Sequence, residues 1–301
     1  MLILKNPKIA VPVVLFAGLI WSFGPLVVRY MEEPNLVPWQ YIFGRGLTIF
    51  ILLNLFLYFE EGVNFWKNYL KIGKSGIIGG FGLGIAMISF IYSITNTSAA
   101  ITLLCLAAMP FFTAVLAYLF LKEKISMNVW VSIIIATIGI IIMALGNTEK
   151  NSLLGFIFGL TSSIGFSVFS VTLRWRKETP KFTTVAIAGL FCFVFATIVI
   201  LSTKQTFFST SYNSSMFSLH GTLVCLGLIL YSIGSKAIPA AELTLLSLTE
   251  VIGGIFWVWL PLFGINEIPS TNTIVGGFFL FVSLIYYSLI MRWNKRFIAL
   301  N

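Results

Sequence analysis

The chain has 301 residues, of which 58% are hydrophobic and only 10% are charged, and its mean hydropathy is +0.98. A soluble domain carries roughly a quarter charged residues because its surface faces water, so this composition excludes an ordinary soluble protein. The net charge of +9 on so apolar a background is typical of a multi-span membrane protein rather than of a protein that binds nucleic acid.

The chain contains ten apolar stretches of the length that a transmembrane helix needs, about 20 residues. They cover 9–28, 38–59, 76–95, 98–121, 127–146, 153–173, 182–203, 217–235, 240–264 and 271–291. Only the polar residues Thr95-Asn96-Thr97 mark the boundary between the third stretch and the fourth, so nine spans is the alternative. The first stretch lacks the small-residue cleavage site of a signal peptide, and we expect it to be a membrane helix.

The basic residues indicate how these helices are oriented. With ten spans and a cytoplasmic N-terminus, fifteen of the 19 Lys and Arg residues fall on the inside, three fall outside, and Arg45 lies within a span. Positive charge accumulates on the cytoplasmic side of membrane proteins. The sequence therefore predicts a multi-pass protein of the cytoplasmic membrane with both termini in the cytoplasm.

Two parts of the chain resemble each other. The letters YSI begin at Tyr92 and again at Tyr231, and each copy is followed by a pair of alanines and the letters TLL. We predict two five-helix repeats, 1–148 and 149–301, of which the second enters the membrane from the opposite side. Inverted repeats of this kind build the two access states of many secondary transporters around a site near the membrane midplane.

The sequence resembles the EamA family of the drug/metabolite transporter superfamily. The segments that carry the resemblance are TSAAITLLCLAAMPFFTAVLAYLFLKEKIS and IPAAELTLLSLTEVIGGIFWVWLPLFGINEIPS, together with Trp21, Arg45, Pro110, Glu123, Glu250, Glu267 and the pair Gly276-Gly277. The resemblance implies ten helices and the transport of amino acids or similar amphipathic metabolites, often by export. After Glu250 the second segment has no counterpart of Pro110, so we expect the two halves to differ there.

Glu250 is the sharpest functional signal, because it lies about ten residues inside the ninth span. A carboxyl group at such depth costs a few kcal/mol on insertion scales. Helical spacing would place Glu250 on one face with Ser247, Gly254 and Trp257. We predict that it faces a central cavity, where it binds a substrate amine or carries a proton; the alternative is a hydrogen-bonded glutamate that joins helices.

Arg45 lies seven residues into the second span, between Gly44 and Gly46. It is a candidate for binding a substrate carboxylate or for forming an electrostatic gate. Alternatively, it bonds backbone carbonyls or extends to the outer interface. The sequence leaves open whether Arg45 and Glu250 share one cavity.

Aromatic residues supply further candidates. Tyr92 and Tyr231 occupy matching positions in the two repeats, where they would line the cavity or simply bond neighbouring helices. Trp21 and Trp257 are candidates for stacking against a substrate, with packing as the alternative. We expect His220, the only histidine, to be a polar residue at the outer interface.

The sequence also indicates where helices end or are interrupted. Pro25 and Pro110 lie within apolar stretches and are expected to kink their helices. Glu123 and Glu267 each come three residues before a serine that would cap the next helix, which favours roles at helix ends. We expect the three cysteines to be buried rather than paired in disulfides.

The functional prediction is a secondary transporter of a small amphipathic metabolite, an amino acid or a relative, which works by alternating access with proton coupling or exchange. The alternative cargo is a larger solute, such as a nucleotide derivative or S-adenosylmethionine. The chain has no phosphate-binding loop, no Asp and one His, which argues against an ATP-driven pump or a membrane-embedded enzyme and makes a lipid flippase a poor fit.

We expect a cavity lined by the first, third, fourth, sixth, eighth and ninth spans. The expected partners are the substrate, the lipid bilayer and protons. No cofactor, metal or nucleic acid is expected, and the protein is expected to be a monomer or a homodimer.

Overall fold

The computed structural model describes residues 7–124, 126–145, 152–176, 178–266, 268 and 270–298. These parts of the chain are helical and contain no strand. Eight segments are long and apolar enough to cross a membrane: Lys8–Tyr30, Pro38–Leu70, Gly73–Asn96, Ala99–Leu121, Leu153–Trp175, Lys181–Ser202, Ser211–Gly234 and Ala240–Trp259. The all-helical membrane fold expected from the sequence is therefore confirmed.

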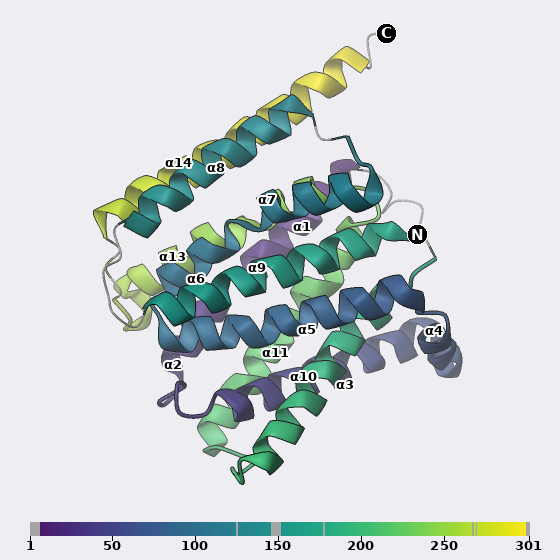
Figure 1. Ribbon diagram of the computed structural model, residues 1–301, viewed down its shortest axis with the longest axis vertical. Helices are drawn as coiled ribbons and strands as arrows, with labels where there is room; N and C mark the ends of the chain where they lie inside the picture. Colours follow the sequence, from purple (N-terminus) through teal and green to yellow (C-terminus); the bar gives the residue numbers. More distant parts are fainter. Residues whose placement is uncertain are drawn as a thin grey trace.

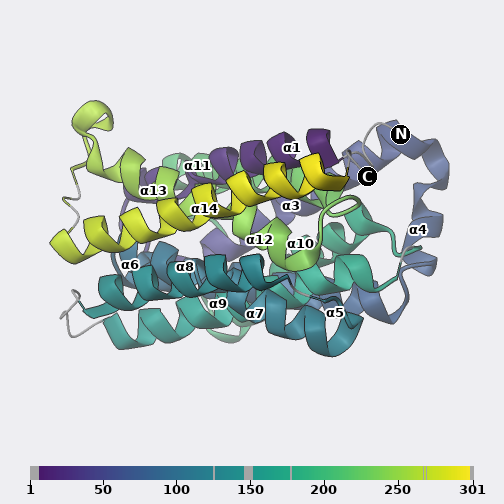
Figure 2. The same cartoon turned by 90° about the horizontal axis from the view of Figure 1, so that it is seen from above.

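The helices run roughly along one common direction (Figures 1 and 2). In chain order they are α1 (Pro7–Trp21), α2 (Gly24–Tyr30), α3 (Pro38–Glu61), α4 (Lys67–Leu70), α5 (Gly73–Asn96), α6 (Ala99–Leu106), α7 (Met109–Leu116), α8 (Met127–Leu145), α9 (Ser152–Trp175), α10 (Lys181–Ser202), α11 (Ser211–Gly234), α12 (Ala240–Ser247), α13 (Thr249–Trp259) and α14 (Thr271–Ile298). The two remaining predicted spans coincide with α8 and α14, whose apolar stretches are shorter, Met127–Ile142 and Ile274–Ser283.

The helices α8 and α14 form a pair at one edge of the molecule (Figure 1). The Asn272 side chain donates to the carbonyl of Ile142 at 3.3 Å, and Ser283 donates to the carbonyl of Ser132 at 2.7 Å. The start of α14 therefore lies beside the end of α8, and the two helices are antiparallel. On the other side of the molecule, α5 packs between α9 and α10.

Glycines let some of these helices approach closely. A Cβ atom on Gly80 would lie 2.6 Å from Ile187, and one on Gly84 would lie 2.3 Å from Phe191, both on α10. The small-residue spacing of Gly80 and Gly84 thus serves contact between α5 and α10, as small residues often do between membrane helices.

Three of the predicted spans are broken in the middle. The first breaks between α1 and α2, just before Pro25, and the fourth breaks between α6 and α7, just before Pro110. Both kinks were predicted from these prolines and are confirmed. The ninth span breaks at Leu248, between α12 and α13, although it has no proline there.

The expectation that the two halves differ at this point is therefore wrong. Ser247 donates to the carbonyl of Thr244 at 2.8 Å, and Thr249 donates to the carbonyls of Leu246 at 3.2 Å and Leu15 at 3.3 Å. Serine and threonine hydroxyls can satisfy carbonyls that a break in a membrane helix sets free. These hydroxyls support the break without a proline.

An ion pair joins two segments of the chain at one end of the molecule. The Arg174 Nε donates to Glu123 Oε1 at 2.7 Å, and Nη1 donates to the carbonyls of Ser235 at 3.1 Å and Ile238 at 2.8 Å. The end of α9 is thereby tied both to the segment after α7 and to the loop between α11 and α12.

The expected helix-end details are partly described. Ser126 accepts a hydrogen bond from the Val129 backbone amide at 3.4 Å and caps α8 as predicted. Glu267 lies outside the described residues. All three cysteines are free and buried, as expected.

Candidate substrate cavity

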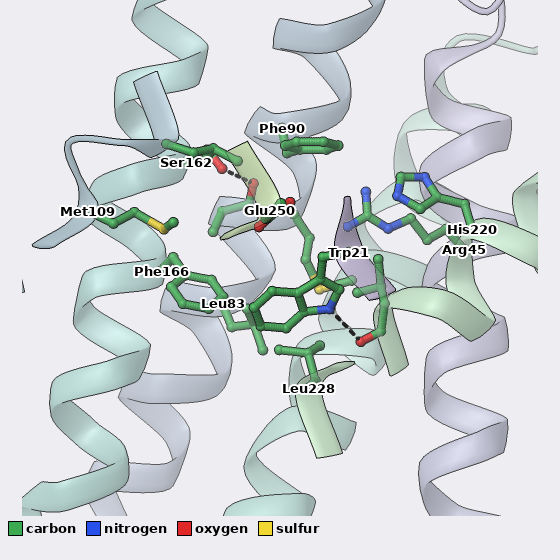
Figure 3. A pocket seen from close by; sticks show the side chains of 14 residues that line it. Trp21, Arg45, Leu83, Phe90, Met109, Ser162, Phe166, His220, Leu228 and Glu250 are labelled. Carbon is green, nitrogen blue, oxygen red and sulfur yellow. Dashed lines mark hydrogen bonds between the residues drawn. The ribbon is translucent and has the colours of Figure 1, made fainter. Parts of the chain in front are cut away.

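A cavity of about 60 Å³ lies in the middle of the molecule, beside the three helix breaks (Figure 3). A water molecule needs roughly 10–15 Å³ of such space, so a few waters would fill it. The six spans that were expected to line the cavity all do so, and α3 contributes in addition. The lining residues are Trp21, Arg45, Leu83, Ala86, Met87, Phe90, Leu106, Met109, Ser162, Phe166, His220, Val224, Leu228 and Glu250.

Arg45 reaches this cavity from α3 and is only 5% exposed. Its Cζ atom lies 5.5 Å from the centre of the Phe90 ring, a distance at which a cation is attracted to the aromatic face. Its Nε and Nη1 atoms have no hydrogen-bond partner. The side chain therefore does not extend to the interface, and a buried guanidinium with two unpartnered nitrogen atoms lies in the cavity wall.

Glu250 reaches the same cavity from the first turn of α13. In Figure 3 its carboxyl group and the Arg45 guanidinium both point into the cavity. No hydrogen bond or ion pair joins the two side chains, both of which the structure describes. The sequence left open whether these residues share a cavity. They do, and opposite charges line it without being paired to each other.

The glutamate also benefits from its place in the helix. Glu250 lies in the first turn of α13, and the helix dipole favours negative charge at this end by about 0.3–1 kcal/mol. The break at Leu248 creates this second helix start in the middle of the span. A carboxylate is thus less costly at position 250 than in an unbroken helix.

His220 is placed differently from the prediction. It is 2% exposed and lines the cavity beside Arg45, so the expected position at the outer interface is wrong. Its Nδ1 atom shares a hydrogen bond with the Tyr41 hydroxyl, and Tyr41 stacks on Phe217 at 4.9 Å. The available signal in the sequence is a polar ring inside an apolar stretch, whereas a position near the helix end does not determine which way the ring faces.

Trp21 closes one side of the cavity (Figure 3). Its Nε1 donates to the carbonyl of Val224 at 3.2 Å, and its ring packs edge-on against Phe166 at 5.7 Å. The indole is therefore both a wall of the cavity and a link between α1, α9 and α11. The tryptophan predicted to contact substrate is in a position to do so.

The two matching tyrosines do not line the cavity. Tyr231 is fully buried behind Trp21, and its hydroxyl shares a hydrogen bond with Ser170 at 2.6 Å. Tyr92 is half-buried and packs against Trp39. The structure therefore gives both tyrosines contacts with neighbouring helices, which was the alternative interpretation.

Ser247 and Trp257 also lie away from the cavity lining. Ser247 is fully buried on α12, and the break at Leu248 removes it from the helix face of Glu250. Trp257 donates to Ser22 at 2.9 Å and stacks on Phe23 at 4.8 Å. The predicted common face assumed a continuous helix, and the break separates Ser247 from it. Trp257 follows Glu250 on the same helix, α13, but its contacts are with Ser22 and Phe23 rather than with the cavity.

Comparison with known proteins also indicates a membrane transporter. The model of the EamA-like transporter family matches residues 8–145. A protein of Helicobacter pylori strain 26695 named "Uncharacterized transporter" is 23% identical over 252 residues, which cover 80% of each chain. A second protein of that name, from strain J99, is 27% identical over 54% of this chain, and the match spans 52% of that relative's length. A third, from Clostridium kluyveri, is 25% identical over 68% of each chain.

One solved crystal structure has a similar fold, with a TM-score of 0.72 at 15% sequence identity, and it covers 96% of this chain and 100% of the other. This likeness concerns the fold alone. The match over residues 8–145 confirms the resemblance drawn from the sequence: this part of the chain is similar to the EamA-like transporter family.

Proposed function

We propose that this protein is a secondary transporter of the cytoplasmic membrane that moves a small amphipathic metabolite, an amino acid or a close relative, by alternating access. The observation that carries the proposal is the single cavity with Arg45 on one side, Glu250 on another and apolar side chains between them. An amino acid has one carboxylate, one ammonium group and a side chain, which match these three parts.

The proposal includes ten membrane helices arranged as two five-helix repeats. The ion pair between Glu123 and Arg174 supports it, because Glu123 follows the fourth span and Arg174 ends α9. Both residues lie at one end of the molecule, so α8 must run back along the bundle before α9 returns. Because α14 pairs with α8 in the antiparallel direction, α14 also runs along the bundle from one end toward the other. The matching breaks within the fourth and ninth spans agree with a duplicated unit.

In this arrangement α1 begins and α14 ends at the same end of the molecule (Figure 2). That end also carries Arg174 and the loop at Ser235. The distribution of basic residues supports the assignment of this end to the cytoplasmic side. Broken helices around a central cavity are a common construction in secondary transporters.

Glu250 is the proposed coupling residue. It is the only carboxyl group among the lining residues, and no protein hydrogen bond or ion pair holds it in the described structure. It would bind the substrate amine and release it, or exchange a proton, as the cavity opens to each side. Proton coupling and substrate exchange are the two modes that this residue supports.

A larger cargo, such as a nucleotide derivative or S-adenosylmethionine, is the second candidate within transport. The cavity volume of about 60 Å³ favours the smaller substrate, because a larger one would require more of the lining to move. Competition by nucleotides but not by amino acids would favour the larger cargo.

Counterflow in proteoliposomes tests the proposal. Vesicles are preloaded with a pool of unlabelled amino acids, and the entry of labelled ones is followed at about pH 6 and pH 8, on either side of neutral. We expect accumulation above that of empty vesicles. Its absence for every amino acid, with folded protein, would contradict the proposed substrate.

The variant Glu250→Gln is measured in the same vesicles, because it keeps the shape of the side chain and cannot carry a proton. If Glu250 is the proton site, the variant exchanges substrate but loses the response to pH. If Glu250 binds the amine instead, exchange itself falls. Wild-type rates with unchanged pH dependence would rule out both roles.

A further inference from the structure

We propose that His220 is a second donor for the substrate's anionic group, so that Arg45 and His220 together form one carboxylate-binding subsite. The inference rests on the proposed function and adds a residue to it. Both side chains line the cavity, one from α3 and one from α11, and each is at least nine-tenths buried: Arg45 is 5% and His220 2% exposed.

The first argument is the number of unused donors. Arg45 Nε and Nη1 are buried without a partner, and a donor without an acceptor in a nonpolar interior is destabilising. No carboxylate of the protein reaches Arg45 in the described structure. A buried guanidinium with free donors is a strong site for a ligand that brings two acceptor oxygens.

The second argument is the orientation of the imidazole. Its Nδ1 is engaged by the Tyr41 hydroxyl, which lies one helical turn before Arg45 on α3. When Tyr41 donates to Nδ1, the proton of the neutral ring is on Nε2, which then becomes a donor. Tyr41 is therefore a positioning residue that fixes the tautomer.

The third argument concerns the surroundings of Nε2. A Cβ atom on Gly24 would lie 2.8 Å from this nitrogen, so the present position of the imidazole requires glycine at position 24. No hydrogen bond to another described residue occupies it. The ring also meets Phe90 edge-on at 6.1 Å, and the same Phe90 ring packs against the Arg45 guanidinium. Phe90 thus holds both donors on one side of the cavity.

Three ligands that differ only in their charged groups test this subsite: leucine, 3-methylbutylamine, which is leucine without its carboxylate, and 4-methylpentanoate, which is leucine without its amine. Binding of labelled leucine to the purified full-length protein, and competition by the other two, are measured for the wild type and for His220→Phe. We expect leucine and 4-methylpentanoate to bind roughly 10- to 100-fold more weakly to the variant, the effect of losing a hydrogen bond to a charged group. Binding of 3-methylbutylamine should not change.

Gly24→Ala is the second variant, since its methyl group would lie 2.8 Å from Nε2, which is close enough to displace the imidazole from its present position. It should weaken the two carboxylates selectively, as His220→Phe does. Thr222→Val, on α11 but outside the cavity lining, is the control and should bind all three ligands as the wild type does.

The outcomes separate the two proposals. Equal weakening of all three ligands by His220→Phe would give His220 a structural role and overturn the inference, as would unchanged leucine binding. A wild-type protein that binds none of the three ligands would overturn the inference as tested with leucine, whereas the proposed amino-acid substrate is contradicted only by the absence of counterflow for the whole pool.

Discussion

Arg45 is the residue whose interpretation differs most between the sequence and the structure. From its position alone, an interfacial guanidinium was as reasonable as a substrate ligand. In the structure it is buried, two of its nitrogen atoms are unpartnered, and Glu250 lies on the same cavity. A buried charge without a protein partner is costly, and such residues in membrane helices commonly mark substrate pathways.

We expect Arg45→Gln to weaken the binding of a carboxylate-bearing substrate by about 1.5–3 kcal/mol, roughly 10- to 150-fold, because a hydrogen bond to a charged group is lost. Concentration dependence of counterflow gives this change as a rise in KM. Arg176→Gln removes an exposed positive charge and serves as the control. If the two variants have the same KM, Arg45 does not contact the substrate.

At the residue scale, the sequence located Glu250, Arg45 and Trp21 because polar and bulky groups are conspicuous in apolar helices. The sequence also suggested that Tyr231 and Ser247 line the cavity, but neither of them does. Which way a side chain points depends on whether its helix is continuous, and the hydroxyl bonds that support the break at Leu248 are contacts between segments far apart in the chain.

At the scale of the helices, the closest contacts are made by glycines. A Cβ atom on Gly165 of α9 would lie 2.5 Å from the carbonyl oxygen of Gly82 on α5. The obstacle is backbone, which cannot rotate away as a side chain can. The packing of α5 against α9 therefore requires glycine at position 165.

We expect Gly165→Ala to destabilise the protein by about 1–3 kcal/mol, the usual cost of inserting a methyl group into a well-packed interior. The measurement is the thermal unfolding temperature in detergent. Gly277→Ala is the matched control, since a Cβ atom there meets nothing within 4 Å, and alanine is the better helix former. Equal unfolding temperatures for Gly165→Ala and the wild type would show that α5 and α9 can separate.

At the scale of the whole molecule, the central question is whether α8 and α14 cross the membrane with the other helices. Their apolar stretches are shorter than those of the eight clear spans. The shared end of Glu123 and Arg174 nevertheless requires α8 to run the length of the bundle.

Accessibility of single cysteines checks this topology. In a variant without Cys105, Cys192 and Cys225, we expect a cysteine at Ser126 to react with a membrane-impermeant thiol reagent only from the cytoplasmic side. One at Ser152, at the start of α9, should react only from the outside. Reaction of both from the same side would mean that α8 does not cross, and the ten-span proposal would be wrong.

The sequence by itself determined that this is an all-helical membrane protein, where most of its helices lie and which transporter family its first half resembles. These properties follow from hydropathy, from proline positions and from local motifs, all of which act over short stretches of chain. It also indicated Arg45 and Glu250, because charged groups are rare in such a background.

Only the tertiary structure decided that these two charges share a cavity and that His220 stands beside them. Both results depend on how α3, α11 and α13 pack, and the hydrogen bond between Tyr41 and His220 joins residues separated by 179 positions. Spacing along one helix contains no information about which face meets which neighbour. That information arises when helices pack, because burial and hydrogen bonding are then satisfied between distant parts of the chain.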